Sequence, residues 1–81
     1  MNKYTSIEEA YESEFGHLEH SDNYRAARVG DAEEMQRYVN LMRLGCCGYR
    51  EVVVLIEEGA MVGGEMHTWT STYLLGCNYG H

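Results

Sequence analysis

The stretch Arg50-Glu-Val-Val-Val-Leu-Ile-Glu-Glu58 holds the longest uninterrupted apolar run of the chain. Three of its five apolar residues are valines and one is an isoleucine, and such β-branched side chains favour extended backbone. A short apolar run between charged residues is typical of a buried strand. We therefore expect a central strand over residues 49–57, with the rest of the chain covering it.

Length and composition predict one globular domain over residues 1–81. A domain of 81 residues buries only roughly 60% of the surface that its unfolded chain exposes, so its stability is marginal. Apolar residues make up 44% of the chain and charged residues 23%, as in globular proteins, which excludes extensive disorder. A second copy or a partner would add to so small a core.

The charge balance is strongly acidic. Thirteen Asp and Glu against six Lys and Arg give a formal charge of −7, and residues 6–22 hold six carboxylates without a Lys or Arg. Such a surface keeps a small protein soluble, repels nucleic acid and membranes, and attracts basic protein surfaces. No segment approaches the roughly 18 apolar residues of a membrane helix, and the acidic N-terminal region does not match a signal peptide. We expect a cytoplasmic protein that contacts neither nucleic acid nor membrane directly.

The first expected helix begins at the capping box Ser6-Ile-Glu-Glu9, in which Ser6 accepts from the amide of Glu9 and Glu9 returns to the amide of Ser6. The apolar residues that follow recur at steps of four, four and three: Ile7, Tyr11, Phe15 and Leu18. This spacing makes one apolar stripe along a helix. Gly16 lies inside the stripe, so we expect the helix to end between residues 15 and 20.

Two further helices are expected before the central strand. The cluster Ser21-Asp22-Asn23 precedes residues 24–29, whose composition predicts a short helix closed by Gly30. Asp31 then caps a longer helix that stops at Gly45. Its apolar residues lie at i, i+3, i+4 and i+7, as Met35, Tyr38, Val39 and Met42.

A second strand is expected over residues 65–75, joined to the first by a glycine-rich loop over residues 59–64. In this strand one face, which we expect to be packed, holds His67, Trp69, Ser71, Tyr73 and Leu75. The other face, which we expect to be exposed, holds Met66, Thr68, Thr70, Thr72 and Leu74.

The predicted fold is therefore α+β: two or three N-terminal helices packed on a C-terminal antiparallel β-hairpin. Two strands alone are marginal in water. The hairpin should either gain a third strand from a terminus or pair across a two-fold axis in a dimer.

Cysteine and histidine suggest a second kind of function, a small metal- or ligand-binding module. Its residues would be His17 and His20, the pair Cys46-Cys47, and Cys77 with His81. Zinc knuckles place two to four residues between paired ligands, and these cysteines do not follow that spacing. Buried thiols often serve as small hydrophobic residues. We expect no cofactor and no metal.

Catalysis has little support in the sequence. A cysteine with His67 or His81 as its base could form a nucleophilic pair in space, but no motif indicates one. We expect that the protein is not an enzyme.

Three features of the chain support a resemblance to a known type of protein. They are the small size, the absence of a catalytic signature and the carboxylate-rich helix Ser6-Ile-Glu-Glu-Ala-Tyr-Glu-Ser-Glu-Phe15. In these features the chain resembles the small acidic proteins that bacteriophages encode to block host defence, including anti-CRISPR proteins and DNA-mimic inhibitors. The resemblance implies a non-enzymatic inhibitor of a basic, nucleic-acid-handling complex in the bacterial host, such as a CRISPR or restriction effector.

Such effectors hold nucleic acid in grooves lined with Lys and Arg, and a rigid acidic helix could occupy phosphate positions there. A steric block at another surface, through Tyr24, Arg25 and Arg28, is the other route to inhibition. The expected partner-binding residues are Glu8, Glu9, Glu12, Glu14, Glu19, Asp22, Tyr24, Arg25 and Arg28.

Overall fold

The computed structural model describes residues 1–16, 24–42 and 49–78. The described residues form two helices and one four-stranded mixed sheet, which confirms the α+β class. The expected Ser21-Asp22-Asn23 cap, the helix stop at Gly45 and the Cys46-Cys47 turn lie outside the described residues. No helix in the described part of the chain is long and apolar enough to cross a membrane.

The sheet is built on one long hairpin, β3 (Tyr49–Val62) and β4 (Glu65–Asn78). The expected strand at residues 49–57 is present but longer, and the loop predicted at residues 59–64 is wrong. Gly63 and Gly64, at φ 58° and 84°, form a two-residue turn that pairs Val62 with Glu65. Backbone of this hand matches the twist of a hairpin and suits glycine. The ladder therefore continues through Gly59 to the turn.

Two short strands flank the hairpin in the order β1-β3-β4-β2. From the N-terminal segment, β1 (Lys3–Tyr4) pairs parallel with Leu55 and Ile56 of β3. On the other side β2 (Tyr24–Arg28) pairs antiparallel with Tyr73 to Cys77 of β4. The hairpin thus gains a third strand from the N-terminus, one of the two arrangements expected from the sequence.

The short helix predicted for residues 24–29 is wrong, because this segment is β2. Its Arg-Ala-Ala-Arg sequence has good intrinsic helix propensity, but propensity is a weak preference that tertiary contacts override. Tyr24 and Ala27 are both buried, and they belong to hydrophobic clusters on opposite faces of the sheet. Pairing with β4 buries both faces of a five-residue segment, which a short isolated helix could not do.

The first helix, α1 (Ile7–Phe15), starts and stops where the sequence indicates. The Ser6 side chain accepts a hydrogen bond from the amide of Glu9, as predicted. The Glu9 carboxylate returns to Thr5 rather than to Ser6, and accepts from both the Thr5 amide and its hydroxyl. Gly16 ends the helix in the left-handed conformation at φ 97°.

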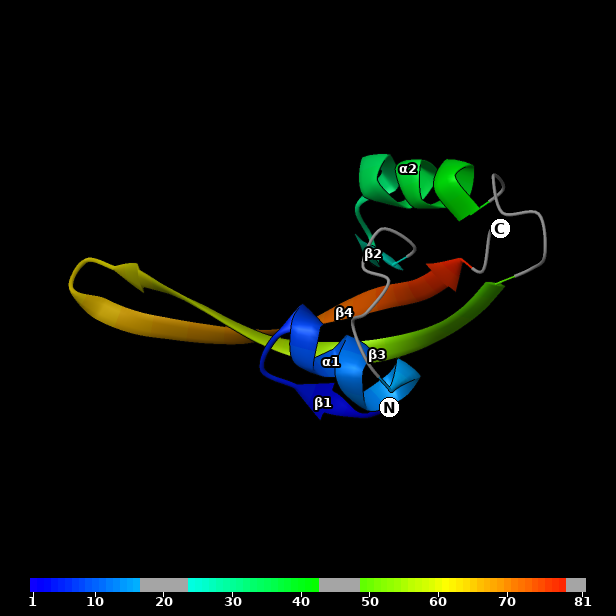
Figure 1. Ribbon diagram of the computed structural model, residues 1–81. Helices are drawn as coiled ribbons and strands as arrows, with labels where there is room; N and C mark the ends of the chain where they lie inside the picture. The colour runs from blue at the N-terminus through cyan, green and yellow to red at the C-terminus, as the bar shows by residue number, and fades with distance from the viewer. Residues whose placement is uncertain (17–23, 43–48, 79–81) are drawn as a thin grey trace.

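The second helix, α2 (Ala32–Met42), begins behind Asp31, which accepts from the amide of Glu34 at 3.0 Å. This confirms the predicted cap. The two helices lie on opposite faces of the sheet (Figure 1). One core cluster joins α1 to Val54, Ile56, Tyr73 and Leu75, and the other joins α2 to Ala27 and Leu74.

Both helices cover the same half of the hairpin, and the other half projects from the body as a two-stranded arm (Figure 1). We define the arm as residues 57–70. The described chain extends 47 Å along its longest axis and 27 and 21 Å along the others. The predicted packed face of β4 is correspondingly right for Ser71, Tyr73 and Leu75, which are buried, and wrong for His67 and Trp69, which are exposed on the arm.

Gly76 shows how closely α2 packs on the sheet. A Cβ atom at this position would overlap the Tyr38 hydroxyl and lie 3.0 Å from the sulfur of Met42. The Tyr38 hydroxyl donates to the carboxylate of Glu51 at 2.9 Å. Any side chain at residue 76 therefore has to displace a buried ring and break this bond.

Gly76→Ala should lower the free energy of unfolding by about 1–3 kcal/mol because it overpacks the α2 face. Urea unfolding followed by circular dichroism measures this. In the double variant Gly76→Ala/Tyr38→Phe the overlapping oxygen is gone, so its loss should be smaller than the sum of the two single losses. Additive losses would contradict the proposed contact.

Candidate functional site

The outward face of α1 carries the carboxylates that the sequence predicted for partner binding. Glu8, Glu9 and Glu12 are exposed, while Ala10 and Tyr11 are buried against the sheet. Glu8 and Glu12 are four residues apart and so share one side of the helix. The cap at one end and the glycine at the other hold this short helix in place.

Two of the four described α1 carboxylates also have structural bonds. Glu9 is bound to Thr5, and Glu14 accepts from the Tyr4 hydroxyl and, at 2.9 Å, from the side-chain amide of Asn2. These hydrogen bonds lower the pKa of both carboxyl groups, the Thr5 hydroxyl for Glu9 and the Tyr4 hydroxyl for Glu14 being the larger causes. Glu9 and Glu14 thus tie the N-terminal segment to α1, and Glu8 and Glu12 remain as the carboxylates directed to solvent.

Arg50 lies 5.3 Å from the centre of the Phe15 ring of α1, and three of the other four Lys and Arg side chains of the described chain form the following ion pairs. They join Lys3 to Glu57 at 3.5 Å, Arg28 to Glu58 at 3.0 Å and Arg37 to Glu33 at 3.9 Å. None of these described pairs includes a carboxylate of α1. The negative charge of this face is therefore not cancelled by them.

Of the remaining predicted partner-binding residues, the three that the structure describes do not form one patch. Tyr24 is only 8% exposed, and its ring is stacked 4.8 Å from the ring of Tyr11 and 5.8 Å from that of Phe15, between β2 and α1. It is a core residue that supports α1, and little of its ring is accessible at the surface. Arg25 and Arg28 point to opposite faces of β2, towards α2 and towards the base of the arm. Glu19 and Asp22 lie outside the described residues.

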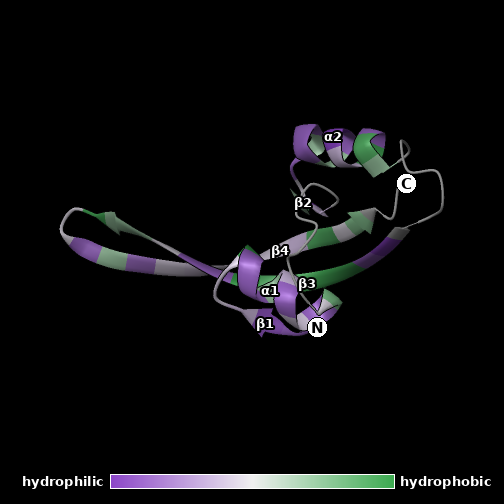
Figure 2. Cartoon of the chain, in the orientation of Figure 1, coloured by the Kyte–Doolittle hydropathy of each residue, from purple (hydrophilic) through white to green (hydrophobic). Residues whose placement is uncertain are grey.

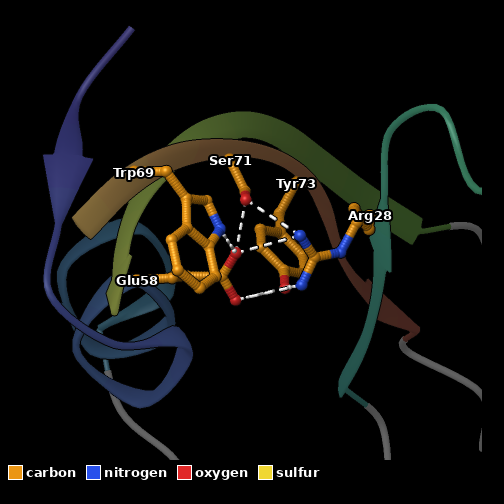
Figure 3. A network of polar contacts seen from close by, with 5 residues as sticks. All are labelled: Arg28, Glu58, Trp69, Ser71 and Tyr73. Carbon is orange, nitrogen blue, oxygen red and sulfur yellow. Dashed lines mark hydrogen bonds and ion pairs between the residues drawn. The ribbon is translucent and has the colours of Figure 1, made fainter. Parts of the chain in front are cut away.

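Five side chains meet where the arm leaves the body (Figure 3): Arg28, Glu58, Trp69, Ser71 and Tyr73. The Glu58 carboxylate is the centre of this network, which we call the arm-base network. It accepts from the Ser71 hydroxyl, from the Trp69 indole at 3.2 Å and from the Tyr73 hydroxyl at 3.0 Å.

Arg28 closes the arm-base network from β2. Its guanidinium donates to Glu58 at 3.1 Å, to Ser71 at 2.9 Å and to Tyr73 at 2.8 Å, and it lies 5.2 Å from the centre of the Tyr73 ring. The side chains of Arg28 and Glu58 are 40% and 23% exposed. Partial burial strengthens charge-assisted hydrogen bonds relative to those in water.

The pKa shifts agree with this geometry. The Ser71 hydroxyl, followed by Tyr73 and Arg28, lowers the pKa of Glu58, and burial opposes them. Burial and the bond to Glu58 raise the pKa of Tyr73. The Glu58 carboxylate therefore stays ionised and accepts several hydrogen bonds at once. This suits a structural link between β2, β3 and β4 rather than a proton-transfer group.

Sequence reasoning missed the arm-base network. Its members are separated by up to 45 residues, and only the pairing of β2 with β4 brings Arg28 beside Tyr73. One signal was available: Glu58 continues the alternation of Val54 and Ile56, which are buried. A carboxylate on the buried face of a strand requires a cation or several donors.

The metal and nucleophile candidates find little support among the described residues. There, no group of three His, Cys, Asp or Glu side chains is arranged to hold a metal ion. Cys77 is a half-buried free thiol whose pKa is raised by burial, which disfavours the reactive thiolate. The other proposed ligands, His17, His20, Cys46, Cys47 and His81, lie outside the described residues.

A cavity of about 40 Å³ lies between β2 and α2, lined by Arg25, Ala26, Glu34, Arg37, Tyr38 and Leu41. Small-molecule sites occupy about 300–1,000 Å³, so this cavity has room for water and not for an organic ligand.

The arm exposes large apolar side chains on both strands: Met61 of β3 falls in the predicted loop, whereas Met66 and Trp69 of β4 fall in the predicted second strand. Met61 and Met66 are each 63% exposed and face each other across the hairpin, and Trp69 is 44% exposed. In Figure 2 the end of β3 is coloured hydrophobic, whereas the β4 half of the arm is mostly hydrophilic with one hydrophobic band near the turn. Comparison with protein-family models, curated proteins and solved structures gives no match for this chain.

Glu58→Gln should lower the free energy of unfolding by about 1–3 kcal/mol, because it removes the charge from several hydrogen bonds at once. The matched control is the adjacent Glu57→Gln, which loses a surface ion pair and should cost less than about 1 kcal/mol. Urea unfolding of the two variants measures the difference. Equal losses would show that the network does not brace the arm.

Acid should destabilise the protein from about pH 4.5 downwards. The pKa values of Glu9, Glu14 and Glu58 are all lowered from 4.5, so the folded state binds fewer protons than the unfolded state. Their contribution is complete above the unfolded value and is lost as pH falls through the folded values. Thermal unfolding midpoints between about pH 3 and 7 test this, and Glu58→Gln should flatten the decline. A midpoint that rises with acidification would contradict the assignment.

Proposed function

We propose that this protein is a non-enzymatic inhibitor that binds a basic, nucleic-acid-handling complex in the bacterial cytoplasm, such as a CRISPR or restriction effector. The observation that supports it is the outward face of α1, where Glu8 and Glu12 are exposed and take no part in the ion pairs of the described chain. Carboxylates without internal cations are available to Lys and Arg of a partner.

The mechanism is electrostatic competition for a groove that normally holds nucleic acid. Four residues of helix separate Glu8 from Glu12 by about 6 Å along the axis. One strand of a duplex carries a charge about every 3.4 Å of its axis, so the two carboxylates span about two phosphate steps. The aromatic stack of Tyr11, Phe15 and Tyr24 fixes α1 on the sheet, which limits the entropy lost when a partner binds.

A steric block is the weaker version of the same function. It was expected to use Tyr24, Arg25 and Arg28, but the Tyr24 ring is buried and Arg28 is engaged with Glu58. The electrostatic version does not need these side chains to be available.

Dimer formation through the hairpin belongs to this proposal. A two-fold dimer doubles the number of acidic helices and therefore the number of contacts to an extended basic groove.

The test is displacement of fluorescent duplex DNA from purified CRISPR effectors and restriction enzymes. Against an effector that the wild type inhibits, Glu8→Gln/Glu12→Gln should need about tenfold more protein, because two charge contacts are lost. Rising salt should weaken the wild type more than this variant.

Glu33→Lys is the matched control. It changes the net charge by the same +2 units but lies on α2, on the opposite face of the sheet from α1. It should displace DNA as the wild type does. If both variants lose activity equally, net charge and not the α1 face is responsible, and the proposal fails.

A further inference from the structure

Among the described residues, the arm has no strand paired with either of its outer edges. Along β3, β1 pairs only with Leu55 and Ile56, and along β4, β2 pairs only with residues 73–77. Within the described chain, residues 57–62 and 65–70 therefore have one strand neighbour each, namely one another. A two-stranded ribbon is marginally stable in water by itself, so a further strand that pairs with it would stabilise it.

The backbone of β4 is oriented to accept another strand. In an antiparallel pair, alternate residues direct both their amide and their carbonyl away from the partner. Thr72 is one of these residues, because its carbonyl accepts from the amide of Val29 at 2.9 Å on the side away from β3. By alternation Thr70, Thr68 and Met66 direct their backbone groups to the same open side.

The other edge of the arm is protected. The amide of Leu55 donates outward to Asn2, so the open positions on β3 are Glu57, Gly59 and Met61. Charge and glycine at an edge both oppose strand addition. The β4 segment Met66-His-Thr-Trp-Thr70 contains no Asp, Glu, Lys, Arg, Gly or Pro, and Thr and Trp favour strands.

We propose that Met66 to Thr70 pairs antiparallel with the same segment of a second copy of this chain, which joins two arms into one continuous sheet. We call this segment the pairing edge. A two-fold axis at Thr68 places Met66 opposite Thr70 of the other copy and His67 opposite Trp69. Five residues fit between the end of β2, which bonds Thr72 through Val29, and the turn at Gly63 and Gly64.

Charge favours a second copy over another protein as the occupant. Two chains of −7 repel each other wherever their carboxylates meet, and pairing through the β3 edge would bring Glu57 and Glu58 close to those of the other copy. The pairing edge holds no carboxylate, so like chains can meet there without this cost. A basic partner gains nothing from a neutral segment and is attracted to α1 instead.

The pairing also reduces the apolar exposure of the arm. Met66 and Trp69 are 63% and 44% exposed in the single chain. Each comes to lie beside a side chain of the other copy, and cross-strand pairs of this kind stabilise a sheet. About six backbone hydrogen bonds form, two at Thr68 and two at each flanking pair.

The experiment is sedimentation equilibrium of the free 81-residue chain, without any partner, over a range of concentrations. The wild type should have the mass of two chains at micromolar concentration. Raising the salt concentration should strengthen the dimer, because it screens repulsion between two acidic bodies. A single-chain mass throughout overturns the proposal and leaves the role of α1 to its own test.

Thr68→Pro locates the interface. The Thr68 amide points away from β3, so proline removes no bond within the hairpin but removes both bonds at the two-fold axis. The dimer dissociation constant should rise by about thirtyfold. Unchanged far-ultraviolet circular dichroism shows that the hairpin itself persists.

Lysine on each edge gives a pair of matched variants. Thr68→Lys places two cations opposite each other and should weaken the dimer at least about fivefold, whereas Met61→Lys on the β3 edge should leave the mass unchanged. The reverse result assigns the interface to β3 and overturns the proposal.

Hydrogen exchange gives a readout without substitution: the amides of Met66, Thr68 and Thr70 should be protected, and those of Glu57 and Gly59 should not. Equal exchange on both edges also overturns it.

Discussion

The antiparallel ladder between β3 and β4 is the interaction on which the rest of the structure depends. It pairs every residue from Tyr49 to Val62 with one from Asn78 to Glu65. The two-residue turn at Gly63 and Gly64 sets this register, and a shift of one residue would move every side chain to the opposite face. Val54 would then leave the α1 core, and Gly76 would no longer lie under Tyr38.

The hairpin is longer than the body that covers it, because two helices of nine and eleven residues cannot enclose two strands of fourteen. The chain places α1 and α2 on opposite faces of the same half, which gives a closed core with Leu75 and Val54 fully buried. The other half remains as the arm. The arrangement that completes a core in this small domain leaves the arm uncovered by either helix.

Carboxylates have separate roles according to their position. Glu58 binds Arg28 and three other donors at the base of the arm, and Asp31 caps α2. Glu9 and Glu14 fix the N-terminal segment that supplies β1. Glu8 and Glu12 have none of these tasks. The acidic composition is thus partly structural, and only a fraction of it is available to a partner.

The sequence by itself determined the features that depend on neighbours within a few residues. Ser6 and Asp31 as helix caps, Gly16 as a helix stop and the valine-rich central strand all follow from local hydrogen bonds and short periodicities. The acidic face of α1 follows in the same way, because helical spacing alone places Glu8 and Glu12 together.

Only the tertiary structure decided that residues 24–28 form β2, that the hairpin extends to Val62, and that Arg28 meets Glu58. These features join residues tens of positions apart. The free energy that selects them comes from burial and pairing against β4, and it exceeds the small helix preference of an Arg-Ala-Ala-Arg segment. Local sequence patterns do not depend on such distant partners. For this reason they did not predict β2, the arm or the arm-base network, which the tertiary structure shows.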